Sequence, residues 1–192
     1  MRSFVSLAPQ RVMLLVLLAV LAGCQSVTGG LMSLRGGYAD IPVDALREVA
    51  GEIEQAVATG NQEAAISDRG GIVVGTEPIK QAIRMRAARR ELLDDFLDSG
   101  FAWERRNGQV WVIRSREYKK AGTSRDRDRD ALMVSSECAN RWTIYEGILK
   151  ASNFSPKELT TVQRIFFEER IKNMKPGQKY EDESGNEAIV GP

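Results

Sequence analysis

Apolar residues recur at steps of three and four along four segments of the chain, which is the spacing that places side chains on one face of an α-helix. This pattern predicts amphipathic helices over residues 41–58, 77–99, 131–151 and 156–173. Gly60, Gly100 and Pro176-Gly177 follow three of these segments and are typical helix ends. Ser155 and Glu158 have the spacing of a capping box at the start of the last helix.

Two shorter stretches have the character of β-hairpins. Asn107-Gly108, a dipeptide typical of tight hairpin turns, separates residues 101–106 from residues 109–113. A second hairpin is predicted near the end of the chain, with strands around Tyr180 and at 188–190. We expect Trp103 and Trp111 to share one face and to pack against the preceding helix rather than to form a ligand platform. The predicted fold class is mainly α with small β-hairpins (α+β), in which amphipathic helices pack with one or two short hairpins.

The first apolar run has the order of a secretory signal. Arg2 and Arg11 precede the apolar residues 12–22, and this region contains no acidic residue. The run is too short for a membrane-spanning helix, which needs about 20 apolar residues. It ends in Leu21-Ala22-Gly23-Cys24, which resembles the lipobox of bacterial lipoproteins.

The resemblance to a lipobox implies that residues 1–23 are a signal peptide that is removed. It also implies that Cys24 carries a diacylglyceryl group and an N-linked acyl chain such as palmitate. Several acyl chains anchor a protein firmly, whereas one chain does so only marginally. Gln25 is not the aspartate that retains such lipoproteins in the inner membrane, so the implied location is the periplasmic face of a Gram-negative outer membrane. The alternatives are an uncleaved signal anchor and a soluble secreted protein.

The rest of the chain divides by composition. Residues 24–40 contain Gly-Gly pairs and several Ser, which predicts a flexible tether. Residues 41–114 are predicted to form a helical unit with a hairpin, and residues 131–192 a C-terminal unit with two helices. Between them, residues 115–130 contain almost nothing to bury and include alternating Arg and Asp, which predicts a charged linker or the exposed start of a helix. We expect the two units to pack together as one domain.

Composition excludes several classes of function. The chain carries 27 basic and 26 acidic residues, and loss of Arg2 and Arg11 with the signal peptide changes the formal net charge from +1 to −1. This balance does not suggest a nucleic-acid partner. The absence of histidine excludes histidine-based catalytic triads and histidine-ligated zinc, and no metal or other cofactor is predicted. Cys138 falls on the apolar stripe of its helix, which predicts a buried, inert thiol.

Two sets of charged residues are candidates for direct function. The basic cluster Arg84, Arg86, Arg89 and Arg90 would suit lipid headgroups or an acidic partner, but it is balanced by Glu91, Asp94, Asp95 and Asp98. We therefore interpret it as a solvated helix face. The pairs Glu168–Glu169 and Asp94–Asp95 are candidate hydrolase carboxylates. Neighbouring helical residues point about 100° apart, so we expect these pairs to be solvated rather than to converge on a substrate.

Part of the C-terminal unit resembles a known family. The residues that carry the resemblance are Asn140-Arg141, Tyr145, Asn153, Lys175-Pro176-Gly177 and Tyr180, followed by a glycine turn. In this order they resemble the YdbL-like periplasmic proteins, a family of unknown function, over roughly residues 138–190. The chain departs from that family at Glu187, where a tryptophan is common, and in its lipobox and long middle insert.

The resemblance implies no catalysis. YdbL-like proteins are associated with an envelope system in which an AsmA-like inner-membrane protein bridges to a small outer-membrane lipoprotein for lipid transport. By analogy this chain is expected to be a non-catalytic, lipid-anchored interaction or assembly factor with an envelope protein as partner. The candidate partner surface is aromatic, although each residue also fits the core: Trp142, Tyr145, Phe154 and Phe166. The alternatives are a lipid-binding carrier with an apolar cavity and an envelope hydrolase that uses carboxylates.

Overall fold

A computed structural model describes residues 38–192, and these residues form one compact unit. The predicted signal peptide, the lipid attachment site Cys24 and residues 24–37 of the predicted tether lie outside the described residues. The helices are α3 (Val43–Ala58), α4 (Glu77–Ala88), α5 (Arg90–Asp98), α6 (Arg116–Ala121), α7 (Ser124–Ala151) and α8 (Leu159–Ile171). A short 3-10 helix, η1 (Pro156–Glu158), precedes α8. The strands are β1 (Ala102–Glu104), β2 (Val110–Val112), β3 (Lys179–Glu181) and β4 (Glu187–Ile189).

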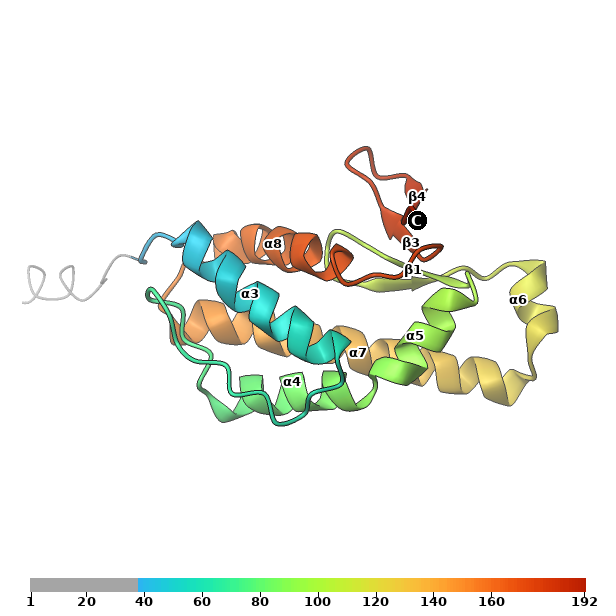
Figure 1. The fold of residues 1–192 in the computed structure, drawn as a ribbon, viewed down its shortest axis with the longest axis horizontal. Coiled ribbons are helices and arrows are strands. Elements are labelled where there is room, and N and C mark those ends of the chain that lie inside the picture. The colour runs from blue at the N-terminus through green and yellow to red at the C-terminus, as the bar shows by residue number, and fades with distance from the viewer. Residues whose placement is uncertain (1–37) are drawn as a thin grey trace, which may run out of the picture. The chain divides into compact units, whose positions relative to one another are not determined.

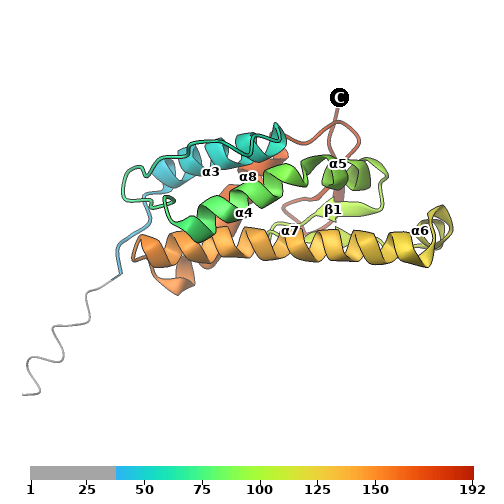
Figure 2. The same ribbon diagram turned by 90° about the horizontal axis from the view of Figure 1, so that it is seen from below.

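The predicted fold class is confirmed: helices dominate, and four short strands form a small sheet. The 28-residue helix α7 is about 42 Å long at the usual rise per residue, and it runs along the body beside α4 (Figure 2). Helix α3 lies against α8 and α4 (Figure 1). The larger core lies between these four helices and contains Leu46, Ile53, Ile79, Ile144, Ile148 and Phe166, all at most 4% exposed.

The two hairpins join into one sheet. The strand order is β2-β1-β3-β4, with antiparallel pairing within each hairpin and parallel pairing between β1 and β3. The Asn107-Gly108 turn has the predicted place, and Gly108 adopts a φ of 83° that favours glycine. The parallel pairing of Trp103 with Lys179 ties residues 41–114 to residues 131–192, as expected for one domain.

A smaller core lies under this sheet, between α5, α6 and the first half of α7. It is formed by Leu93, Phe96, Leu97, Ala102, Val110, Tyr118, Met133 and Val134. Cys138 packs against this cluster, as its place on the apolar stripe of the helix predicted. Its side chain is only partly buried, so the prediction of a buried thiol is confirmed only in part.

The helices differ from the predictions at three boundaries. The helix predicted over 77–99 is interrupted at Arg89, which separates α4 from α5. For segment 115–130, predicted as a charged linker or the exposed start of a helix, the second alternative is correct from Ser124, where a capping box of Thr123 and Asp126 starts α7, and the unpredicted helix α6 precedes it. Ser155 caps η1 through the amide of Lys157, and the Glu158 carboxylate accepts a hydrogen bond from Thr161, so the predicted capping box does not form.

Gly147 allows α4 and α7 to approach closely. A Cβ atom at this position would lie 2.7 Å from Cγ1 of the buried Ile79. Such a distance is below van der Waals contact, so a larger residue would push the two helices apart.

We predict that Gly147→Ala lowers the free energy of unfolding by about 1–3 kcal/mol, because overpacking outweighs the gain in helix propensity of up to about 1 kcal/mol. The matched control is Gly51→Ala in α3, where the added Cβ would meet Glu169 at an ordinary 3.4 Å. We expect Gly51→Ala to leave stability unchanged or slightly higher. Urea unfolding followed by circular dichroism measures both, and equal effects would contradict the proposed close approach.

Candidate functional site

A ring of buried charges lies where α3, α4, β1, α7 and α8 meet. The charge ring consists of Glu54, Arg86, Glu104, Glu137, Arg141 and Arg170, each at most 3% exposed. Arginine and glutamate are seldom buried unless they are paired, so the partners of each group decide whether this ring is a site for chemistry or part of the scaffold.

The α7 side of the ring is held by Arg141. Its two Nη atoms each lie 2.7 Å from a carboxylate oxygen of Glu104, a bidentate pair between the helix and strand β1. Its Nε donates at 2.8 Å to Glu137, one helical turn earlier. Nη1 also donates to the carbonyl oxygen of Gly108 in the hairpin turn, at 3.1 Å. Arg141 therefore fixes the first hairpin against α7.

The opposite side of the ring is held by Arg86 and Arg170. Arg86 donates to both carboxylate oxygens of Glu54 at 3.1 and 2.8 Å and to Glu137 at 2.8 Å. Arg170 donates to Glu54 at 3.0 Å and to Glu104 at 3.5 Å. The ring thus closes with strict alternation of sign, each glutamate lies between two arginines, and its formal net charge is zero.

The hydroxyl of Tyr145 lies beside the ring and accepts a hydrogen bond from Arg170 at 2.7 Å. Its ring stacks at a tilt on Phe166, 5.0 Å away in the larger core. The Arg170 Nε is buried and has no hydrogen-bond partner among the described residues. Tyr145 therefore links the charged centre to the apolar core around it.

The ring keeps its groups ionised. Burial by itself raises the pKa of Glu54, but the charges of Arg170 and Arg86 outweigh this effect and lower the pKa to about 2. Opposing arginine charges also outweigh burial at Glu104 and Glu137 and lower the pKa of both carboxyl groups. The ring glutamates therefore carry no proton at neutral pH and cannot act as general acids.

The structure corrects our interpretation of the basic cluster in residues 84–90. Arg86 belongs to the buried charge ring, and Arg90 is buried and pairs with Asp94 at 2.6 Å, so neither lies on a solvated face. Arg84 is exposed as predicted, and Arg89 reaches Glu137 at 3.5 Å. These four arginines therefore do not form one surface patch.

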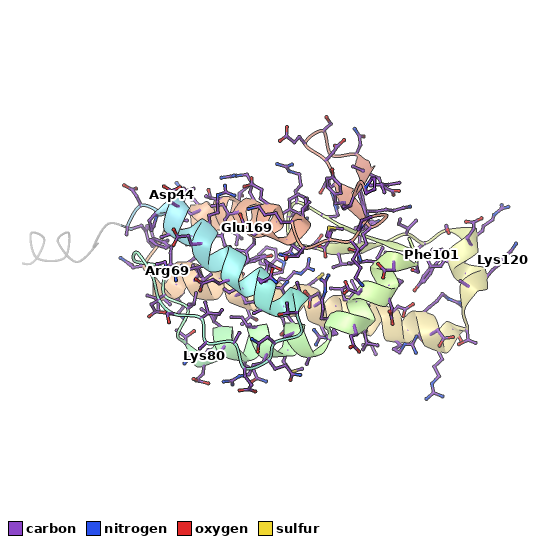
Figure 3. All side chains as sticks on the ribbon, in the orientation of Figure 1. Asp44, Arg69, Lys80, Phe101, Lys120 and Glu169 are labelled. Atoms are coloured by element: carbon purple, nitrogen blue, oxygen red, sulfur yellow. The ribbon has the colours of Figure 1, made fainter. Side chains whose placement is uncertain are left out.

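Three of the four candidate hydrolase carboxylates are held in ion pairs, and Glu169 and Asp94 are buried, so the expectation that these pairs are solvated is wrong for both. Glu169 lies on α8 facing α3 (Figure 3), and its carboxylate binds Arg47 at 3.1 Å and Lys172 at 2.6 Å. Glu168 binds Arg47 at 2.8 Å and Arg164 at 2.7 Å. In the second pair, Asp94 is bound to Arg90 and Lys175, whereas Asp95 is exposed.

The aromatic residues predicted as a partner surface do not form a surface. Tyr145, Phe154 and Phe166 are buried in the larger core, as their alternative interpretation predicted, and Trp142 is half-buried.

An exposed aromatic residue lies on the sheet instead. Trp103 and Trp111 are direct cross-strand partners, and Trp111 is 50% exposed. The guanidinium carbon of Arg105 lies 6.0 and 5.3 Å from the centres of these two rings. The expectation that both tryptophans pack against the preceding helix is therefore wrong for Trp111.

The surface of the described residues also has hollows. A pocket of about 490 Å³ opens beside Tyr38, with an apolar floor that includes Leu149, Phe154 and Leu159 and with Lys150 at its rim. Within residues 38–192, no group of three or more Cys, Asp or Glu side chains is placed to hold a metal ion. None of the helices in this part of the chain is long and apolar enough to cross a bilayer.

Comparison of the chain with protein-family models, with curated proteins and with solved structures finds no match. The resemblances to lipoproteins and to YdbL-like proteins therefore stay predictions. Arg141 and Tyr145, two of the residues that carry the second resemblance, lie in and beside the charge ring.

We predict that Arg141→Met lowers the free energy of unfolding by about 3–5 kcal/mol, because it removes one of the two ring arginines that pair with each of two buried carboxylates, Glu104 and Glu137. The matched control is Arg84→Met on α4, an exposed arginine whose replacement should change stability by no more than about 0.5 kcal/mol. Urea titration at pH 7 measures both values. If Arg141→Met changes the free energy of unfolding by less than about 1 kcal/mol, the charge ring is not essential for stability.

The lowered pKa values also predict sensitivity to acid. The folded-state pKa of Glu54 is about 2 and lies below its ordinary value of 4.5, so this carboxylate contributes stability above pH 4.5 and loses it as the pH falls towards 2. We expect the free energy of unfolding to be level above about pH 5 and to fall steeply between pH 4.5 and 2. Glu54→Gln should make this fall shallower. A level stability down to pH 3 would show that the ring does not govern acid unfolding.

Proposed function

We propose that this protein is a non-catalytic, lipid-anchored envelope protein that acts as an interaction or assembly factor in outer-membrane maintenance or lipid transport. The lipobox-like sequence Leu21-Ala22-Gly23-Cys24 supports the anchor, and Gln25 supports the periplasmic face of the outer membrane. The C-terminal resemblance to YdbL-like proteins supports the role in envelope assembly.

The observation that carries the non-catalytic part of the proposal is the closed charge ring. The most deeply buried ionisable groups of the described chain bind one another, and the shifts in their pKa values keep them ionised near neutral pH. Such a ring stabilises one arrangement of helices and sheet, and its carboxylates, ionised and already paired with arginines, offer no general acid. A rigid body of this kind supports a role in holding a partner.

A lipid carrier is the second candidate, and the pocket beside Tyr38 is the observation that favours it. Its volume of about 490 Å³ is within the range of small-molecule sites, and its floor is apolar. Tyr38 is only 14 positions after Cys24, so the chain between them can hold the pocket no more than about 50 Å from an acylated Cys24. The hydrolase alternative is less well supported, because Glu168, Glu169 and Asp94 are held in ion pairs.

We predict that mass spectrometry of protein extracted from membranes will find a mature chain that begins at a triacylated Cys24. Cys24→Ala should abolish both cleavage and acylation at this site. Cys138→Ala is the matched control, and it should leave both unchanged because Cys138 lies within the folded domain. An intact or unmodified N-terminus in the wild-type protein would contradict the anchor.

Chemical crosslinking in the same membranes tests the interaction role. Crosslinks from the wild-type protein to one envelope protein would support an assembly factor. Phospholipid co-purified in a fixed ratio, without such crosslinks, would favour the carrier.

A further inference from the structure

One face of the sheet carries a continuous row of side chains that is exposed at both ends. The cross-strand partners Trp111, Trp103, Lys179 and Ile189 follow one another across the four strands, so their side chains share one face. Glu104 lies on the opposite face and binds Arg141 in the charge ring. We call this the outer row, and its two ends are its most exposed members, with Ile189 60% and Trp111 50% exposed.

The two edges of this sheet are finished differently. At the β2 edge, the amide of Val110 points away from β1 and donates to Sγ of Cys138 on α7, at 3.4 Å. This contact places the helix against the outer side of β2. At this edge α7 therefore binds the outward amide of Val110, whereas the outward amide of Val112 has no hydrogen-bond partner among the described residues.

The β4 edge is open. The backbone amide of Val190 donates to the carbonyl oxygen of Gln178, and the amide of Asp182 donates to the carbonyl oxygen of Asn186. Because hydrogen-bonded pairs alternate along an antiparallel ladder, the backbone amide and carbonyl of Ala188 also point towards β3. The amide and carbonyl groups of Glu187 and Ile189 then point away from the sheet, and they have no partner among the described residues. Strand β4 has no proline, lysine or bulge, although its length of three residues and the charge of Glu187 are themselves devices that limit pairing at an edge. Figure 1 shows the β3–β4 hairpin projecting from the body of the domain.

The same hairpin is acidic. Residues 179–190 include Glu181, Asp182, Glu183 and Glu187 but only one basic residue, Lys179. Lys179 binds Glu187 at 2.7 Å, and Arg105 binds Glu181 at 3.3 Å. Asp182 accepts hydrogen bonds from the amides of Ser184 and Asn186 and holds the turn, and Glu183 is exposed. The edge therefore combines free backbone groups, an exposed isoleucine and surplus negative charge.

We propose that the β4 edge is a docking site for an extended segment of another protein, which adds to the sheet as a fifth strand. Unpaired amide and carbonyl groups in a row are matched by an extended backbone. The charge of the hairpin selects a segment with basic residues, and Ile189 selects an apolar residue on the outer face. This inference rests on the proposed interaction role and names the surface that performs it.

Backbone amide exchange of the ¹⁵N-labelled full-length protein in detergent tests this docking site. The probes are the capped peptides Val-Lys-Val-Lys-Val-Lys and Val-Glu-Val-Glu-Val-Glu, and a form of the first in which alternate backbone nitrogens are methylated. We expect the lysine peptide to slow the exchange of the Glu187 and Ile189 amides. The glutamate peptide should bind several-fold more weakly, and the methylated peptide should give no protection because it cannot pair along its backbone.

Ile189→Pro is the decisive variant. It removes the outward amide but no hydrogen bond to β3, and proline is tolerated at strand edges that face solvent. We expect it to keep the Val190–Gln178 hydrogen bond and to lose peptide binding. Ile189→Thr, which keeps the amide, should retain binding, and Trp111→Thr at the far end of the outer row should bind like the wild type.

Three outcomes would overturn the docking site. Unchanged binding of the lysine peptide to Ile189→Pro would exclude pairing at this edge. Equal binding of the methylated and unmethylated lysine peptides to the wild-type protein would exclude it as well, and this second test does not depend on whether the proline disturbs the hairpin. Protection of Glu187 and Ile189 that rises with protein concentration in the absence of peptide would assign the edge to a second copy of this chain. Each result leaves the lipid anchor and the crosslinks to envelope proteins as separate findings, so failure of the docking site is distinguishable from failure of the proposed function.

Discussion

The alternating charge ring is the interaction on which the rest of this structure depends. Six ionised groups have been removed from water, and each is stabilised only while its neighbours keep their positions. Because the ring takes one or more members from α3, α4, β1, α7 and α8, it fixes these five elements relative to one another. Apolar packing alone tolerates small shifts of a helix, whereas bidentate pairs between arginine and glutamate define both distance and orientation.

The ring also decides which surfaces of the sheet are free. Glu104 turns one face of β1 towards Arg141, and the pleat then places Trp103 on the other face. Helix α7, held by the same arginine, brings Cys138 against the outer edge of β2. The outward backbone groups of β4 and the exposed ends of the outer row remain accessible to a partner. The partly buried thiol of Cys138 thus has a structural role at the β2 edge. The exposed Trp111 and Ile189 lie on the face of the sheet opposite to Glu104.

Much of the fold was predictable because it depends on local spacing. The steps of three and four around Leu46 and Ile53, the dipeptide Asn107-Gly108 and the pattern around Tyr180 predicted four helical segments and two hairpins, and the structure confirms them. The break at Arg89 and the capping box at Thr123 were missed, although Asp126 follows Thr123 at the spacing of such a box. The charged alternation after Thr123 suggested a linker because it offers little to bury, but it is compatible with a helix whose first turns extend beyond the core.

The charge ring was missed, although part of its signal is local. Glu137 and Arg141 belong to a four-residue series with Met133, Tyr145 and Leu149, so two charged residues occupy core-facing positions of α7. Arg86 was assigned to a solvated face because nearby acidic residues balance it in sequence. The sequence by itself determined the helices, the hairpins and the class of the fold, since these follow from side-chain periodicity and turn chemistry over a few residues. Only the tertiary structure decided that the hairpins share a sheet, that Glu54 meets Arg170 across 116 positions and that one edge stays open, because these depend on which elements pack together.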